Sequence, residues 1–253
     1  MSVAPPSQQQ RPARHVAPGA AIALAYQVVL RQLTSRSLII GLSLLALVAP
    51  ISGFALGSAD ASLDDSVNLI ASVGLGLVLP VVSLVFAGAA IGDLRDDKTL
   101  VYLWLRPMDR WPLVVGAALA AGTLAAPITI VPIVAAAVLT GAGNGIVAGT
   151  LLATVVGLVA YVGVFTVFGV WLRRFIVWGL AYILIWEGFI AQAGPGVAQL
   201  ALRKYTRSIL VDRTGADLDL ADFGIVAAVV VPLLVAVVAL VVASWRLANQ
   251  DID

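Results

Sequence analysis

The chain has 253 residues, of which 61% are hydrophobic and 11% are charged, with a formal net charge of +1. Soluble domains are about 45–50% apolar and about 25% charged. This composition, with a mean hydropathy of +1.03, therefore excludes an ordinary soluble domain and indicates an integral membrane protein. The charge gives no reason to expect nucleic-acid binding. The absence of cysteine excludes disulfides and thiolate metal sites.

Residues 1–19 form a polar tail that is rich in Pro, Gln and Arg and holds the only histidine, His15. This composition predicts a disordered cytoplasmic segment, and it lacks the apolar core and cleavage site of a signal peptide. Ala20–Ser37 follows, with bulky apolar residues such as Tyr26 and Leu33 at helical spacing. It predicts an amphipathic helix that either lies in the membrane interface or extends the first span on the cytoplasmic side.

Six apolar runs then occur, each close to the about 20 residues that cross a bilayer. Their bounds are 38–56, 67–91, 113–139, 146–172, 175–193 and 223–245. The third and fourth runs form one uncharged stretch, which we divide at the glycine-rich turn Thr140–Gly145. We therefore predict an all-α integral membrane protein with six transmembrane helices within residues 20–246, followed by a cytoplasmic C-terminus, 247–253.

Basic residues predict the orientation, because Lys and Arg accumulate in short cytoplasmic loops. With the N-terminus inside, eleven basic residues are cytoplasmic: Arg11, Arg14, Arg31, Arg36, Arg95, Lys98, Arg106, Arg110, Arg173, Arg174 and Arg246. The other four, Arg203, Lys204, Arg207 and Arg213, all fall in one outer loop. Most tryptophans, namely Trp104, Trp111, Trp171, Trp178 and Trp245, also fall near the predicted inner ends. We therefore predict a multi-pass protein of the cell (plasma or inner) membrane with both termini inside.

Proline and glycine within the runs predict kinks and close packing. The prolines that can kink a span are Pro50, Pro80, Pro127, Pro132 and Pro232. Two glycine pairs, Gly88–Gly92 and Gly145–Gly149, have the small-xxx-small spacing that lets helices approach closely. We interpret both pairs as packing contacts.

Glu187 is the one acid inside a predicted span, and Trp186 precedes it. A charge near the membrane centre costs at least about 2.5–3.5 kcal/mol, so such a residue usually faces protein or water. Glu187 and Trp186 are therefore candidates for a substrate pathway. The alternative is a structural hydrogen bond from Glu187 to a neighbouring helix or to the outer loop.

The outer loop, 194–222, contains a second amphipathic pattern. Val197–Val211 places Leu200, Leu202 and Ile209 among basic residues, after a Pro-Gly start. The pattern predicts a helix that either lies on the outer leaflet or re-enters the membrane.

Gly92–Gly116 is a polar segment between two apolar runs, and it must therefore lie at a membrane face. Its charges are Asp93, Arg95, Asp96, Asp97, Lys98, Arg106, Asp109 and Arg110. Mixed signs with interleaved Leu, Tyr and Trp favour a surface helix with a partner. The alternative is a solvated loop whose basic residues only set the topology.

Two absences bear on the energy source of any transport. This sequence contains no G-x-x-x-x-G-K-[ST] phosphate-binding loop and no H-E-x-x-H motif. It has no paired acids within the predicted spans, which argues against a self-contained ion-coupled carrier. An active transporter with this sequence would take its energy from another subunit.

The polar segment resembles the cytoplasmic segment after the second span of ABC transporter permeases of the ABC-two class, which have the type V exporter fold. That family shows an acid, Gly-Thr-Leu, a Leu-rich turn, Pro-x-x-Arg and Gly-Lys. The matching residues are Asp93, Asp97, Thr99, Leu100, Leu103, Pro107, Arg110 and Gly116. The chain departs from the pattern where Lys98 replaces the glycine and Ala117 replaces the lysine.

The resemblance implies an export permease in which two such chains, identical or different, form the pathway. It implies no ATPase site and no cofactor in this chain, because a separate ATPase subunit would bind ATP and Mg²⁺. That subunit would dock on a coupling helix comprising Asp93, Arg95, Asp97, Thr99, Leu100, Leu103, Arg106, Pro107 and Arg110. Two alternatives stay open: a membrane scaffold that recruits a cytoplasmic partner through the same segment, and a secondary carrier.

Overall fold

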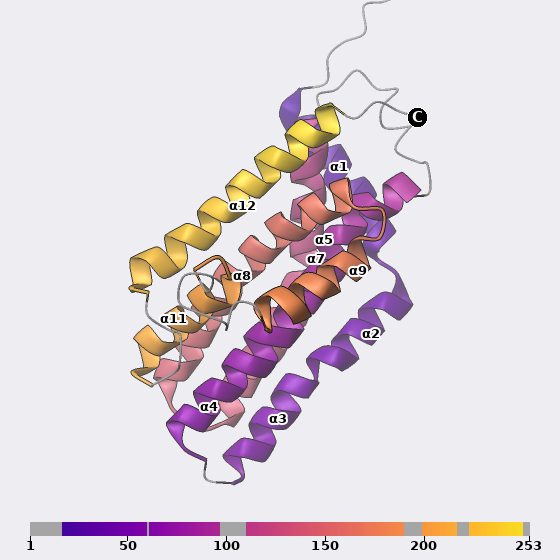
Figure 1. Ribbon diagram of the computed structural model, residues 1–253. Helices are drawn as coiled ribbons and strands as arrows, with labels where there is room; N and C mark the ends of the chain where they lie inside the picture. Colours follow the sequence, from indigo (N-terminus) through magenta and orange to yellow (C-terminus); the bar gives the residue numbers. More distant parts are fainter. Residues whose placement is uncertain (1–16, 60, 97–109, 190–198, 217–222, 250–253) are drawn as a thin grey trace, which may run out of the picture.

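The computed structural model describes residues 17–59, 61–96, 110–189, 199–216 and 223–249, and the regular structure within these ranges is helical (Figure 1). Five helical stretches in this part of the chain are long and apolar enough to cross a bilayer. They are Arg36–Gly57, Leu63–Asp93, Trp111–Leu139, Asn144–Trp171 and Ile225–Ala248. The expected α-helical membrane architecture is therefore confirmed. The first, second, third, fourth and sixth predicted spans each correspond to one of these stretches.

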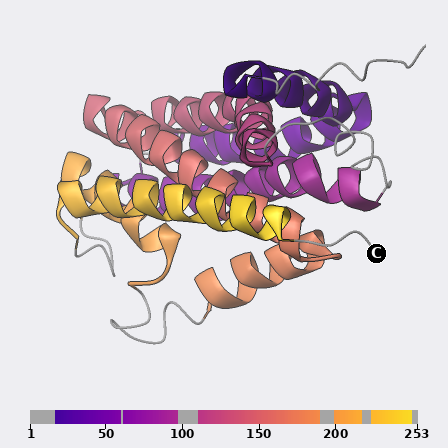
Figure 2. The same ribbon diagram turned by 90° about the horizontal axis from the view of Figure 1, so that it is seen from above.

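Two of the five stretches form the centre of the bundle. Within the apolar windows of Leu63–Asp93 and Asn144–Trp171, 61% of the residues are buried, against 28% or less in the other three. Small residues allow this packing, because a Cβ on Gly169 would lie 2.5 Å from the carbonyl oxygen of Gly88. The two central helices thus touch backbone to backbone. The remaining helices lie around these two, as the two views show (Figures 1 and 2). The three other long stretches are exposed on the faces that point away from the centre.

The amphipathic segment forms α1 (Pro18–Leu33), which ends before Arg36 and is thus separate from the first span. Its buried face is a stripe of two alanines and two larger apolar residues: Ala21, Ala25, Val29 and Leu33. Leu33, one of the bulky residues of the predicted apolar pattern, belongs to this stripe, whereas Tyr26 lies beside it. The alanines face inward because α1 packs on Gly116 of α7 (Trp111–Leu139), where the two backbones meet.

The first two spans are interrupted near their prolines, as predicted. The first comprises α2 (Arg36–Ala46) and α3 (Val48–Gly57), which separate at Leu47, where Pro50 cannot donate to the carbonyl of Ala46. The second comprises α4 (Leu63–Leu69), the π-helix η1 (Ile70–Val78) and α5 (Leu79–Asp96). The π-helix ends just before Pro80, so the missing N–H of proline coincides with the return to α-helical bonding.

The third, fourth and sixth spans have nearly their predicted bounds. They form α7, α8 (Asn144–Trp171) and α12 (Ile225–Ala248). Pro127, Pro132 and Pro232 lie inside continuous helices. The turn between α7 and α8 contains Gly141 and Gly143 with φ of 70° and 98°, a conformation that favours glycine.

The two predicted glycine pairs are confirmed as packing sites. Gly88 and Gly92 of α5 both face the ring of Phe175, and Gly145 and Gly149 of α8 both face Arg213. Side chains at these four positions would collide with or crowd the facing residue.

The fifth predicted span differs most from the structure. It forms α9 (Phe175–Ala181), with seven residues, and the π-helix η2 (Tyr182–Glu187), with six. At about 1.5 Å per residue this is about 20 Å, less than the about 30 Å of a hydrocarbon core. The helix thus ends at Glu187, before the expected end at residue 193. A further helix, α11 (Leu202–Thr214), follows within the predicted outer loop.

Both ends of the described chain lie near the start of α7. A Cβ on Gly116 would lie 2.8 Å from the carbonyl oxygen of Ile22 in α1. Arg110, the residue before α7, donates to the carbonyl oxygens of Leu247 and Ala248 at the end of α12. The N-terminal helix and the C-terminal end of α12 therefore lie at the same end of the bundle (Figure 1).

Gly116→Ala is expected to destabilise the protein by about 1–3 kcal/mol, because its methyl group would overlap the α1 backbone. Gly122→Ala on the same helix is the control, since no atom lies within 4 Å of that site. Thermal unfolding of both variants in detergent tests the close contact of α1 with α7. Equal unfolding temperatures for the two variants would contradict it.

Candidate functional site

Glu187 lies at the end of η2 and is only 3% exposed. Its carboxyl group accepts hydrogen bonds from two tyrosines. The Tyr161 hydroxyl, in the middle of α8, donates to Oε2, and the Tyr182 hydroxyl donates to Oε1 at 2.8 Å. The acid is therefore bound both to its own helix and to a central helix of the bundle.

The start of α11 completes this hydrogen-bonded cluster. The backbone N–H of Leu202 donates to the Glu187 carboxyl group, and the Arg203 side chain interacts with it electrostatically. The Arg203 guanidinium also lies against η1, because a Cβ on Gly76 would be 2.8 Å from its carbon atom. The cluster of Glu187, Tyr161, Tyr182 and Leu202 therefore joins three separate elements: η2, α8 and α11.

Aromatic packing fixes the two tyrosine rings. Tyr161 stacks on Phe165 with ring centroids 5.7 Å apart. Tyr182 makes edge-to-face contacts with Phe165 at 6.0 Å and Phe168 at 5.8 Å. Such pairs contribute about 0.5–1.5 kcal/mol each beyond their buried area. The hydroxyl donors are thus held in place for the carboxyl group.

The α11 helix is buried against protein. Its inward residues are Leu202, Lys204, Tyr205, Thr206, Ser208, Ile209 and Leu210. Two of them, Thr206 and Leu210, face α8, where Cβ atoms on Gly157 and Gly149 would lie 3.0 and 3.2 Å from them. Tyr205 stacks on Phe223 just before α12, with ring centroids 4.6 Å apart.

These contacts place α11 along α8. Its first residue bonds to Glu187 beside Tyr161, and its last turn lies beside Gly145 at the start of α8. The helix predicted for Val197–Val211 is therefore present with later bounds. It starts in the middle of the bundle and runs to the end where α8 begins.

The two proposed pathway residues have different environments. Glu187 is buried and hydrogen-bonded, whereas the neighbouring Trp186 is partly exposed. The hydrogen bonds of Glu187 to Tyr161, Tyr182 and Leu202 match the predicted alternative, a structural bond to a neighbouring helix and to the outer loop. A contact of Glu187 or Trp186 with a transported substrate stays a prediction.

Most of the predicted coupling residues lie outside the described residues: Asp97, Thr99, Leu100, Leu103, Arg106 and Pro107. Asp93 is exposed near the end of α5, and Arg95 follows it in the same helix. Arg110 stands at the other end of the segment. Its Nη1 atom lies 2.8 Å from the carbonyl oxygens of both Leu247 and Ala248.

No protein-family model matches the chain, and no curated protein matches it.

Sequence reasoning identified Glu187 but not its partners. Tyr161 is the one tyrosine in the fourth span, and Tyr182 lies five residues before Glu187. These two hydroxyl groups indicated that the carboxyl group of Glu187 could accept hydrogen bonds from its own span and from the fourth span. The bond from Arg110 to the end of α12 had no local signal, since the residues lie 137 and 138 positions apart.

Tyr161→Phe is expected to destabilise the fold by about 1–3 kcal/mol, because it leaves a buried carboxyl oxygen without its donor. Tyr26→Phe is the matched control, because its hydroxyl makes only a long, exposed bond of 3.4 Å to Thr123. Denaturant unfolding in mixed micelles measures both variants. A loss for Tyr161→Phe no larger than that for Tyr26→Phe would show that the cluster does not hold the helices together.

Proposed function

We propose that the chain is the permease subunit of an ATP-driven ABC exporter of the ABC-two class, acting as a dimer with separate ATPase subunits. The observation that carries the proposal is the pair of hydrogen bonds from Arg110 to the end of α12. These bonds connect the predicted coupling segment, residues 93–110, mechanically to the transmembrane helices. A loop that only sets the topology does not need such a connection.

The connection has a clear physical basis. The last four carbonyl groups of a helix have no partner within the helix, and they carry its negative dipole end. Arg110 satisfies two such carbonyls in α12 and is itself followed directly by α7. The other end of the segment continues from α5. A partner that displaces the segment would therefore move α5, α7 and α12 together.

The topology supports the same proposal. Because the two ends of the described chain lie at the same end of the bundle, we propose an even number of crossings. Five stretches are long enough to cross alone. We propose that α9–η2 and α11 together make the one further crossing, the fifth in chain order, since they meet at Glu187 and each covers about 20 Å. Discontinuous spans with polar groups at their break are typical of transport pathways.

Cysteine labelling tests the orientation, and the chain has no native cysteine to interfere. Leu63→Cys and Asn144→Cys are exposed positions predicted to be outside, and Asn249→Cys is predicted to be inside. A membrane-impermeant thiol reagent is expected to label the first two in intact cells and to label Asn249→Cys only after permeabilisation. The reverse pattern would invert the proposed topology.

ATPase docking is tested with the double variant Asp93→Asn/Asp97→Asn. It is expected to insert normally, because topology depends mainly on Lys and Arg. It is also expected to reduce recovery of a P-loop ATPase with the affinity-tagged chain, since breaking a buried charge contact costs about 2–5 kcal/mol. The exposed acid Asp64, at the opposite end, supplies the control Asp64→Asn.

The same purification distinguishes the alternatives. Recovery of a different cytoplasmic protein would support a scaffold, and recovery of no partner would support a secondary carrier. Unchanged ATPase recovery with the double variant would show that these two acids do not form the docking site.

A further inference from the structure

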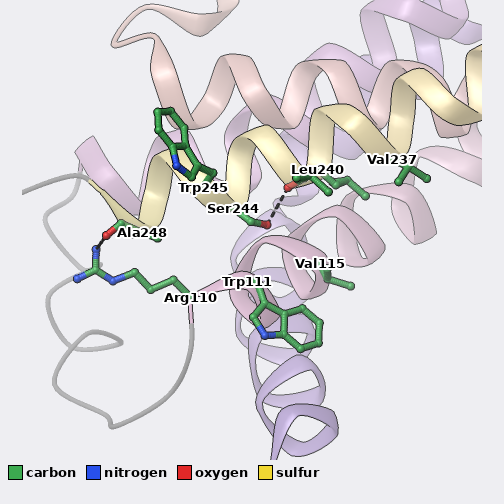
Figure 3. Close-up of a pocket in the computed structure, with 9 residues that line it drawn as sticks. Arg110, Trp111, Val115, Val237, Leu240, Ser244, Trp245 and Ala248 are labelled. Carbon is green, nitrogen blue, oxygen red and sulfur yellow. Dashed lines mark hydrogen bonds between the residues drawn. The ribbon is translucent and has the colours of Figure 1, made fainter.

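A groove runs between the start of α7 and the last turns of α12 (Figure 3). It encloses about 900 Å³ and is lined by Arg110, Trp111, Val115, Val237, Leu240, Val241, Ser244, Trp245 and Ala248. This volume lies in the upper part of the range of about 300–1,000 Å³ that is usual for ligand pockets.

The chemistry of the groove changes along its length. Arg110 lies at one end, beside Ala248, and Trp111 follows it at the start of α7, whereas the ring of Trp245 points to the other side of α12 (Figure 3). The deeper lining is aliphatic and reaches Val237. The Ser244 hydroxyl is bonded to the carbonyl oxygen of Leu240, so it does not make the deeper part polar.

The length of the groove matches one membrane leaflet. The lining residues of α12 run from Val237 to Ala248, about 16 Å at 1.5 Å per residue. Half of a hydrocarbon core is about 15 Å. Tryptophan prefers the headgroup level, which is where Trp111 and Trp245 lie if Arg110 is at the membrane face.

We propose that this groove binds an anionic phospholipid of the cytoplasmic leaflet, with an acyl chain between α7 and α12 and the phosphate beside Arg110. Charge complementarity selects the occupant, because the Arg110 guanidinium, which also donates to the carbonyl oxygens of Leu247 and Ala248, is the charged group among the described lining residues and lies at the shallow end. A cation, a tryptophan and an aliphatic floor follow the order of phosphate, interface and acyl chain in a lipid. The leaflet rests on the orientation proposed above, whereas the binding itself requires neither that orientation nor an ATPase.

Such a lipid has a functional consequence. It contacts both α7 and α12, the helices that Arg110 joins. A bound lipid therefore adds to the contact between α7 and α12 through which the predicted coupling segment, residues 93–110, would act on the bundle. The lipid composition of the inner leaflet then affects how firmly these two helices move together.

Native mass spectrometry of the purified full chain, with an equimolar mixture of phosphatidylglycerol and phosphatidylcholine, tests the proposal. The wild-type chain is expected to retain one phosphatidylglycerol preferentially. Arg110→Gln is expected to reduce that preference about fivefold, since a basic residue near an anionic lipid contributes about 1 kcal/mol. Arg173→Gln, at an exposed arginine outside the groove, is the charge control and should bind as the wild type does.

A steric variant keeps the test valid if Arg110→Gln weakens the fold. Val241→Trp fills the groove from a position that is 62% exposed, and it should abolish retention of the lipid. Val238→Trp, at a position that is 60% exposed on the same helix but outside the lining, should leave retention intact.

Three outcomes would overturn the proposal. One is equal retention of the two lipids by the wild-type chain. Another is full retention of phosphatidylglycerol by Val241→Trp. The third is a dimer that Val241→Trp dissociates and Val238→Trp does not, because the groove would then bind a second copy of the chain.

Discussion

The structure depends on how it satisfies one carboxyl group in the interior of the bundle. An unpaired polar group buried away from water costs several kcal/mol, and Glu187 is almost fully buried. Tyr161, Tyr182 and the N–H of Leu202 all donate to it. This requirement brings the end of η2 and the start of α11 to the same place on α8. The break in the fifth span and the burial of α11 follow from it.

The bond from Arg110 to α12 applies the same principle at the end of the bundle. Carbonyl groups at a helix end need donors, and the donor here comes from the residue that starts another span. The Arg110 guanidinium thus caps the C-terminal end of α12 and connects it to α7. Arg110 is the last residue of the segment proposed to dock the ATPase. Through this contact, a displacement of that segment would be transmitted to α7 and α12.

Much of the fold could be predicted from particular residues. Uncharged runs bounded by Arg or Asp, together with the glycine-rich turn Thr140–Gly145, located the five long spans, and Pro50 and Pro80 located the interruptions in the first two. The fifth run was predicted too long, because its apolar residues continue past Glu187 while the helix ends there. Hydropathy measures the composition of a segment and does not report where an acid finds its hydrogen-bond partners. The candidate site was predictable only in part for the same reason.

The sequence alone determined that this is a helical membrane protein, where most of its helices begin and end, and that Glu187 needed a partner. These properties follow from local composition, since the bilayer penalises every unpaired polar group along the chain. Tertiary structure decided that the partners are Tyr161, Tyr182 and Leu202, and that α1 buries two alanines together with two of its larger residues. Such contacts depend on which helices lie side by side, and that depends on the shapes of many side chains at once.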